Sequence, residues 1–329
     1  MNSKISGSID PLSLALCHYD FLTLEEKRKI QKKLDNPHDL ALISIEELSV
    51  LTGRVFSAKS KIPDTIELLI DRDMHLMKSY SIGVLFYEDD EYPSLLKEIF
   101  DPPFALFYRG NMQVLNNLCV SVVGTRRPTG RGMKSSFDLA SELCVRDITV
   151  VSGLAHGIDS FAHKGAVDSV RQNKYGSTVA VLASGPDSVY PSENRKLAAS
   201  IMQCGGCLVS EYPPLCPPLK WHFPQRNRII SGLSKATVVI EAPAGSGALI
   251  TADFALEQDR ELLFHEAALD YTYTKSLVNP KKMSPSRYVA EGAGVIKTAQ
   301  DVIDRMMDPC TDGSVSAGLH FSQLKLDLQ

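Results

Sequence analysis

The sequence contains no long apolar run and no strong excess of either charge. Its longest apolar stretches, such as 119–123 and 237–240, are far shorter than the roughly 18 residues that a membrane-spanning helix needs. The first residues lack a sustained apolar core followed by a cleavage site, so we expect no secretory signal and a cytoplasmic location. A net charge of −4, from 35 basic and 39 acidic residues, does not indicate a polyanion partner by bulk charge.

Cysteines are few and show no regular pairing. Seven in a chain of 329 residues fit reduced thiols better than a disulfide framework. One CxxC motif joins Cys204 and Cys207, and together with Cys216 and His222 it would complete a Cys3His zinc site. The alternative that we favour is a glycine turn flanked by small buried thiols. We therefore expect no metal and no cofactor.

The composition is that of a globular protein, with 44% apolar and 22% charged residues. At roughly 150 residues per domain, the length allows about two domains. We interpret 1–80 as a helical N-terminal domain, 81–307 as a Rossmann-like domain and 308–329 as a flexible tail. In the first segment, Thr23 and Glu26 are spaced as a capping box, and Gly53 should end a helix over 45–53. A third helix is expected over 64–77.

From residue 81 onward, short apolar stretches alternate with helical patterns. Continuous apolar strands separated by helices are typical of a mostly parallel, doubly wound α/β sheet covered on both faces. Ligands bind such sheets at the carboxyl ends of the strands. We expect strands at 81–87, 104–110, 118–123, 149–151, 178–182, 207–210, 236–240 and 261–264. We expect the intervening helices at 130–143, 156–170, 194–203, 226–233 and 246–258.

The loop after the strand at 118–123 combines glycine with arginine. Gly124 and Thr125 permit a close approach of the backbone to a ligand, and Arg126 and Arg127 add donors for phosphate oxygens. The arginines occupy positions that a dinucleotide-binding loop fills with glycine, so we do not expect NAD. The alternative is a turn that carries two surface arginines.

Further glycine loops follow three other strands, and we expect them to converge on one crevice. Their candidate phosphate-facing residues are Ser152, Gly153, Gly185, Ser246 and Gly247.

The loop after the expected strand at 149–151 also carries titratable side chains. His156, Asp159 and His163 have a spacing that imitates a metal site. We favour Asp159 as a carboxylate at a helix N-terminus, where it suits the helix dipole.

Basic and aromatic side chains interleave over 220–228, in the sequence KWHFPQRNR. Cations that hold phosphates beside rings that stack bases are typical of single-stranded nucleic-acid binding. The candidates are Lys220, Phe223, Arg226, Asn227 and Arg228. The alternative is a packed loop with Trp221 and Phe223 in the core. We favour the core for Trp221 and leave Phe223 open.

Several motifs together resemble the DNA-processing protein A family, also called DprA or Smf. They are VVGTRRPT at 122–129, SGLAHGID at 152–159, YP at 190–191, SEYP at 210–213, FPQRNRIISGLS at 223–234 and SGALITA at 246–252. The resemblance implies a Rossmann-like domain that binds single-stranded DNA, forms a homodimer, protects incoming DNA during natural transformation and helps to load the RecA recombinase.

The resemblance also assigns residues to a DNA pocket. It implies that Arg126, Lys220 and Phe223 lie in that basic pocket and that 226–228 form its wall, where they serve structure as much as contact. Ser192 stands where family members often carry a basic residue, and 265–270 replace a usual Val-Pro-Gly segment, so the pocket edge can differ here. About twenty residues after 307 leave no room for the winged helix that many members add, so we expect none.

An enzyme on the same fold is the alternative function. Phosphoribohydrolases of the lysine-decarboxylase-like type carry Pro-Gly-Gly-x-Gly-Thr followed closely by a catalytic glutamate. Here 243–251 read PAGSGALIT, and no glutamate follows before Glu257. We therefore expect a protein without catalytic residues, which acts by binding.

Overall fold

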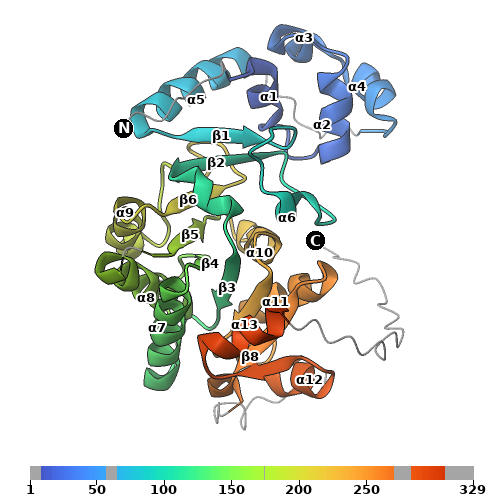
Figure 1. Cartoon of the computed structure of the whole chain (residues 1–329). Helices are drawn as coiled ribbons and strands as arrows, with labels where there is room; N and C mark the ends of the chain where they lie inside the picture. The colour runs from blue at the N-terminus through green and yellow to red at the C-terminus, as the bar shows by residue number, and fades with distance from the viewer. Residues whose placement is uncertain (1–8, 57–64, 174, 270–282, 308–329) are drawn as a thin grey trace.

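The protein is described by a computed structural model that covers residues 9–56, 65–173, 175–269 and 283–307. A sheet with the strand order β1-β2-β6-β5-β4-β3-β7-β8-β9 forms its centre (Figure 1). From β6 to β9 all neighbours are parallel, whereas β1 and β2 join at one end as antiparallel strands. The predicted doubly wound, mostly parallel α/β sheet is therefore confirmed. The strands are β1 Gly83–Phe86, β2 Ala105–Gly110, β3 Cys119–Val123, β4 Thr149–Ser152, β5 Ser177–Val181, β6 Cys207–Ser210, β7 Ala236–Val239, β8 Glu261–His265 and β9 Gly294–Ile296.

Helices cover both faces of the parallel part because its strands are apolar on both sides. On β3, Val120 and Val122 pack with α7, α8 and α13, whereas Cys119 and Val123 pack with α10, α11 and α12. Most predicted helices are present, but α10 begins four residues before the predicted start at 226. The helices of this part are α6 Ser94–Lys97, α7 Gly130–Val145, α8 Ile158–Asn173, α9 Arg195–Gln203, α10 His222–Gly232, α11 Gly247–Glu257, α12 Pro285–Ala290 and α13 Ala299–Met307.

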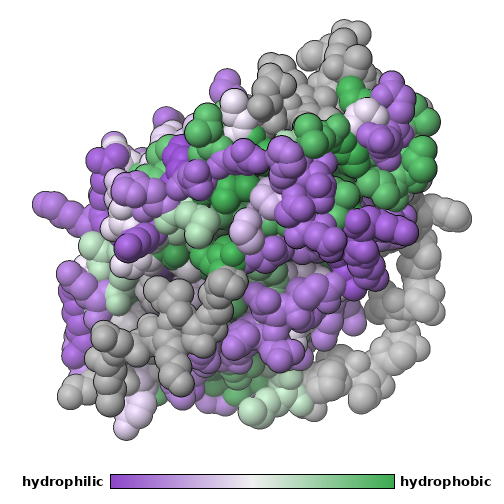
Figure 2. All heavy atoms as spheres, turned by 90° about the horizontal axis from the view of Figure 1, so that it is seen from above, coloured by the Kyte–Doolittle hydropathy of each residue, from purple (hydrophilic) through white to green (hydrophobic). Residues whose placement is uncertain are grey.

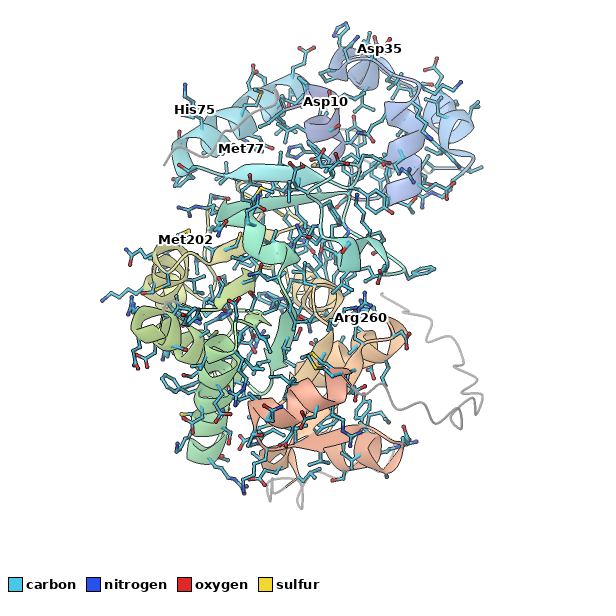
Figure 3. The ribbon with its side chains drawn as sticks, in the orientation of Figure 1. Asp10, Asp35, His75, Met77, Met202 and Arg260 are labelled. Atoms are coloured by element: carbon cyan, nitrogen blue, oxygen red, sulfur yellow. The ribbon has the colours of Figure 1, made fainter. Side chains whose placement is uncertain are left out.

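The N-terminal segment is helical and packs on the antiparallel end of the sheet (Figure 1). The capping box of Thr23 and Glu26 opens the second of its helices, and Gly53 ends the fourth with φ +80°, both as predicted. Asp10 caps the first helix, and Met77 lies buried on the last (Figure 3). The helices are α1 Pro11–Leu16, α2 Leu24–Gln31, α3 Pro37–Leu42, α4 Ile45–Thr52 and α5 Ile66–Tyr80.

One apolar cluster joins this helical segment to the sheet. Leu14 and Ile70 from the helices share it with Phe104 and Phe107, which lie at and within β2. The boundaries of the proposed domains at 80 and 307 stay predictions, and the predicted tail at 308–329 lies outside the described residues.

The outer surface of the N-terminal helices carries both hydrophilic and apolar side chains. Figure 2 shows apolar residues between larger hydrophilic areas on this face. Leu42, Val50 and Leu68 of these helices are among the exposed large apolar side chains. Within the described part of the chain, no helix combines the length and apolar character needed to cross a bilayer.

Candidate functional site

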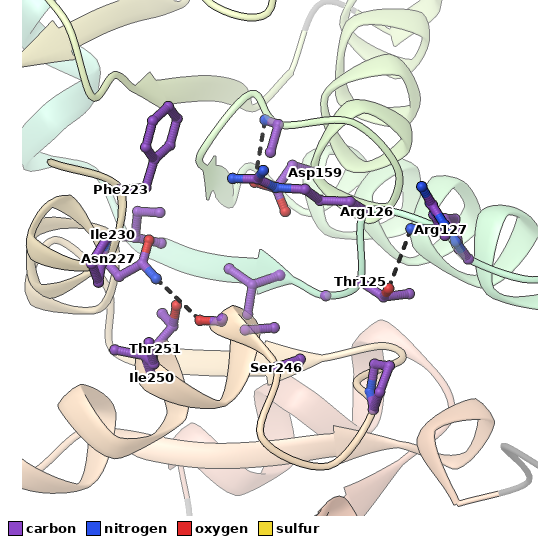
Figure 4. Close-up of a pocket in the computed structure, with 18 of the residues that line it drawn as sticks. Thr125, Arg126, Arg127, Asp159, Phe223, Asn227, Ile230, Ser246, Ile250 and Thr251 are labelled. Carbon is purple, nitrogen blue, oxygen red and sulfur yellow. Dashed lines mark hydrogen bonds between the residues drawn. The ribbon is translucent and has the colours of Figure 1, made fainter. Parts of the chain in front are cut away.

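A cavity of about 810 Å³ opens at the carboxyl ends of β3 and β7 (Figure 4). β3 and β7 are neighbours in the sheet but not in the sequence. After β3 the chain forms β4, β5 and β6 on one side of β3, and then β7 on its other side. Such a switch in strand order leaves a crevice between the loops, where doubly wound proteins bind ligands. Three segments supply most of its lining: 123–129 after β3, 223–230 of α10, and 243–251 at the start of α11. Ala155 and Asp159, which follow β4, complete it.

A buried glutamate holds the arginine loop in place. Glu241, two residues after the end of β7, accepts hydrogen bonds from the Thr129 amide at 2.9 Å and from the Thr129 hydroxyl at 2.5 Å. Its own carbonyl accepts the Thr125 amide at 2.7 Å. This anchoring leaves Arg126 and Arg127 exposed at the cavity rim. Glu241 was not a predicted site residue, although a lone acid at the end of an apolar strand is a usable signal.

The loops after β3 and β4 interlock through a glycine. The Ile158 amide donates to the Thr125 carbonyl at 3.1 Å, and Gly157 beside it has φ +77°. A Cβ at Gly157 would lie 2.3 Å from the Thr125 oxygen, so a side chain there is excluded both by contact and by backbone conformation. The arginine loop is therefore braced from two sides.

Phe223 faces the cavity beside a guanidinium. The Arg126 guanidinium carbon lies 5.4 Å from the centre of the Phe223 ring, within the range of a cation–π contact. Tyr190 packs edge-on against the same ring, with centroids 5.6 Å apart. A smaller cavity of about 40 Å³ lies behind, and Arg126, Tyr190 and Phe223 line it too. Phe223 is thus a cavity residue, not a core residue.

Arg226 forms the floor of the cavity and is 4% exposed. Its guanidinium donates to the carbonyls of Gly153, at 2.7 Å, and Val181. Burial lowers its pKa to about 10, against the opposing effect of nearby Asp159. A Cβ at Gly153 would lie 2.4 Å from this guanidinium, so the glycine makes room for the arginine rather than for a ligand.

Asp159 lies in the first turn of α8, where the sequence placed it. Its carboxylate accepts from the Gly153 amide at 3.2 Å. It also accepts from the Ala155 amide at 3.4 Å (Figure 4). Burial raises the pKa of this carboxyl, while Arg226 and the two amides act in the opposite direction. Among the described residues, no group of three or more His, Cys, Asp or Glu is arranged to hold a metal ion.

The start of α11 supplies the opposite wall. Ser246 precedes the helix and its hydroxyl oxygen is buried without a hydrogen-bond partner. Asn227 lies across from it and donates to the Gly247 carbonyl at 3.2 Å (Figure 4). Predicted residues from the loop after β3, from α10 and from the start of α11 therefore meet in one cavity: Gly124, Thr125, Arg126, Arg127, Phe223, Arg226, Asn227, Ser246 and Gly247.

Five predicted residues do not line this cavity. Gly153 packs against Arg226, Lys220 is exposed, and the remaining three are bonded within the protein. Ser152 is buried and donates to the Val122 carbonyl at 2.7 Å. The amide of Gly185 donates to the carbonyl of Cys216, in the loop after β6, at 2.9 Å. Arg228 is buried against Glu211. We leave these three out of the contact surface because their polar groups are already bonded within the protein.

Two neighbours in the basic-aromatic segment are exposed outside the main cavity. Lys220 lies in the turn before α10 and does not line the cavity. Trp221 is 47% exposed, so its interpretation as a core residue was wrong. α10 begins at His222, and its first turn buries His222 instead of the indole.

His163 is a buried histidine from which we predict a pH dependence of stability. Its Nδ1 lies 2.7 Å from the Thr178 hydroxyl, which donates to the Val150 carbonyl, so Nδ1 carries the proton and Nε2 is left without a partner. Burial, assisted by the charge of Arg226, lowers the pKa of His163 to about 3. An unfolded histidine titrates near 6.5, so below that pH the unfolded chain binds a proton that the folded chain refuses.

We therefore expect the contribution of His163 to be complete above about pH 6.5. It should fall by up to about 1.4 kcal/mol per pH unit as the pH drops from about 6.5 towards 3. Urea unfolding of wild type and His163→Gln across this range measures the difference. Equal slopes of unfolding free energy against pH in the two proteins would contradict the assignment.

The fold and the cavity define a doubly wound α/β protein with a cationic, aromatic crevice at the switch in strand order. The family model described as DNA recombination-mediator protein A matches residues 83–307. The chain belongs to this family. The matched range begins at β1 and ends with α13, so it contains every loop of the cavity.

Relatives agree with this assignment. DNA processing protein DprA of Bacillus subtilis is 37% identical over 238 residues, which are 72% of this chain and 75% of the relative. The X-ray structure of DNA processing protein A from Streptococcus pneumoniae has a TM-score of 0.66 at 30% identity and covers 91% of this chain and 98% of its own. A structure of DNA processing protein A from Helicobacter pylori, whose title names its single-stranded DNA binding mode, has a TM-score of 0.56 at 26% identity. The match covers 70% of this chain and 97% of that protein's chain.

Proposed function

We propose that the crevice binds single-stranded DNA, with Arg126 and Arg127 on the phosphates and Phe223 stacked on a base. The observation that carries this proposal is the Arg126 guanidinium beside the Phe223 ring at the mouth of the 810 Å³ cavity. Neither arginine has a salt-bridge partner among the described residues, so both remain available to an anion. A helix N-terminus at Gly247 adds free amides on the opposite wall.

Selectivity for single strands follows from the shape of the site. Phe223 is recessed between Tyr190 and Arg126, so a base must leave its stack to reach the ring. Bases of a duplex are paired and stacked, and extracting one costs a few kcal/mol. A single strand presents its bases without that cost, and each stacked base contributes roughly 1–3 kcal/mol.

In the cell, we propose that the protein protects single strands and helps to load a RecA-type recombinase on them during DNA uptake or recombination. A homodimer would present two crevices, and one strand that bridges both would bind more tightly through effective concentration. Sedimentation gives the oligomeric state. Recombinase filament growth on strands coated with single-strand-binding protein, with and without this protein, tests loading.

Binding itself is tested by fluorescence anisotropy of labelled single- and double-stranded oligonucleotides across a salt series. We expect a preference for single strands and a linear fall of log affinity with log salt, with a slope of about −0.7 per phosphate contact. Equal affinity for both forms, or affinity that does not change with salt, would contradict the proposal.

The proposal includes no catalytic step. Two acids that hold the crevice loops are engaged: Glu241 binds Thr129 with both oxygens, and Asp159 accepts two amides. Glu257 lies at the far end of α11. Release of base or phosphate from nucleotides, followed by chromatography, would favour a hydrolase instead.

A further inference from the structure

A second groove, of about 240 Å³, lies between the N-terminal helices and the loop after β6. Its core-side wall contains Tyr212, Leu219, Trp221 and His222, and its other wall contains residues of the turn after α1 and Arg72 of α5. This groove belongs to neither cavity described above. Nothing in the crevice proposal requires it.

Trp221 gives the groove an aromatic platform. Its ring packs edge-on against His222 and Tyr212, with centroids 4.1 and 6.4 Å away, while 47% of the residue stays exposed. His222 is in turn stacked on Tyr212 at 3.8 Å. The indole is therefore held in one orientation by buried rings, at little further entropic cost when a ligand stacks on it.

The groove and the crevice lie in line along one edge of the sheet. The strand order β6-β5-β4-β3-β7 places the loop after β6 at one end and the crevice between β3 and β7 at the other. The small cavity lies between them, with Phe223 and Ala183 in its lining. Nδ1 of His222, which lines the groove, lies 3.1 Å from the carbonyl of Ala183, which lines the small cavity. The groove and the small cavity are therefore separated only by this pair of residues.

The first turn of α10 joins the two aromatic platforms. Phe223 and Trp221 are two residues apart, which limits their Cα separation to about 7 Å. Lys220 precedes Trp221 and is exposed. Its ammonium group has no hydrogen-bond or salt-bridge partner among the described residues. A strand that leaves Phe223 along this turn would meet a second ring, Trp221, and then the exposed cation of Lys220.

The polar groups of the outer wall suit a nucleotide. Buried Asp73 bonds His18 at 2.6 Å and Arg72 at 2.8 Å, and so orients both toward the groove that they line. The Arg72 side chain remains 39% exposed and can donate to a phosphate or a base edge. Exposed Asp20 offers an acceptor for an exocyclic amine.

We propose that this groove is a second nucleobase site, in which a base of the bound single strand stacks on Trp221 against a wall formed by the N-terminal helices. The inference rests on the proposed function of the crevice. It assigns the N-terminal segment a direct role in extending the DNA footprint.

The chain offers a built-in probe, because Trp221 is its only tryptophan. We would titrate the full chain with oligothymidylates of about 4 to about 16 nucleotides, the range of site sizes known for single-strand-binding folds, and record anisotropy and indole fluorescence together. Long strands should quench Trp221 at saturation. Strands too short to span both sites should bind more weakly and quench less.

Substitutions separate stacking from indirect effects. Trp221→Ala should lower affinity for long strands about ten-fold and leave short strands nearly unaffected, whereas Trp221→Phe should restore most of the loss. Tyr175→Ala is the matched control: Tyr175 is 61% exposed but precedes β5, at the opposite edge of the sheet. It should bind as wild type does.

Two results would overturn the inference. Long strands that saturate the protein without quenching Trp221, or that bind Trp221→Ala with wild-type affinity, would leave the crevice proposal intact and assign the groove to another occupant. Absence of any binding to single strands would remove the crevice proposal as well.

Discussion

Arg126→Glu should weaken binding of single-stranded DNA at least about thirty-fold. The substitution removes a charge-assisted contact worth roughly 1.5–3 kcal/mol and places a carboxylate where the backbone phosphates pass. It also removes the cation that lies over Phe223. Anisotropy titrations across a salt series would show the lower affinity together with a smaller salt slope, by about one phosphate contact.

Arg146→Glu is the matched control for this charge reversal. Arg146 is exposed and follows the last residue of α7, a helix of 16 residues whose N-terminus borders the crevice. At 1.5 Å per residue it lies about 24 Å from that end. Arg146→Glu should therefore bind as wild type does. If both variants lose affinity equally, net charge alone governs binding and the site assignment fails.

Arg228→Met should lower the free energy of unfolding by about 3–5 kcal/mol, a large part of the total stability of most proteins. The guanidinium of Arg228 binds both oxygens of Glu211 at 2.7 and 2.8 Å and donates to the Asp101 carbonyl at 3.0 Å. Glu211 is only 12% exposed at its side chain, so without Arg228 its charge is left mostly buried and unpaired. Urea unfolding measures the loss.

Two further variants test this explanation. Arg228→Met combined with Glu211→Leu removes both charges and should recover most of the stability. Arg260→Met removes an arginine that is equally buried, but the side chain of its partner Glu98 is 61% exposed and remains solvated, so the cost should be only about 1–2 kcal/mol. Equal losses for Arg228→Met and Arg260→Met would show that the buried partner is not the cause.

The contrast between Arg126 and the buried pair Arg226 and Arg228 shows which parts of the site could be predicted from the sequence. The loop containing Arg126 was placed correctly because it follows an apolar strand, and the end of a strand in a parallel sheet is known from local pattern alone. Arg226 and Arg228 belong to the same basic run, yet both are buried. Their partners, Gly153, Val181 and Glu211, lie on other strands or loops, and no spacing in the sequence reveals those contacts.

The alternation of strands and helices was likewise determined by the sequence alone, because each short apolar strand carries its burial pattern locally. The antiparallel placement of β1 and β2 and the packing of the N-terminal helices on them depend on contacts between distant residues. The same holds for the first turn of α10, which buries His222 against Tyr212 and so turns Trp221 outward. The sequence by itself determined the fold class and the edge of the sheet where ligands bind. The tertiary structure decided which side chains reach that edge, because burial and pairing depend on neighbours that the chain brings together only on folding.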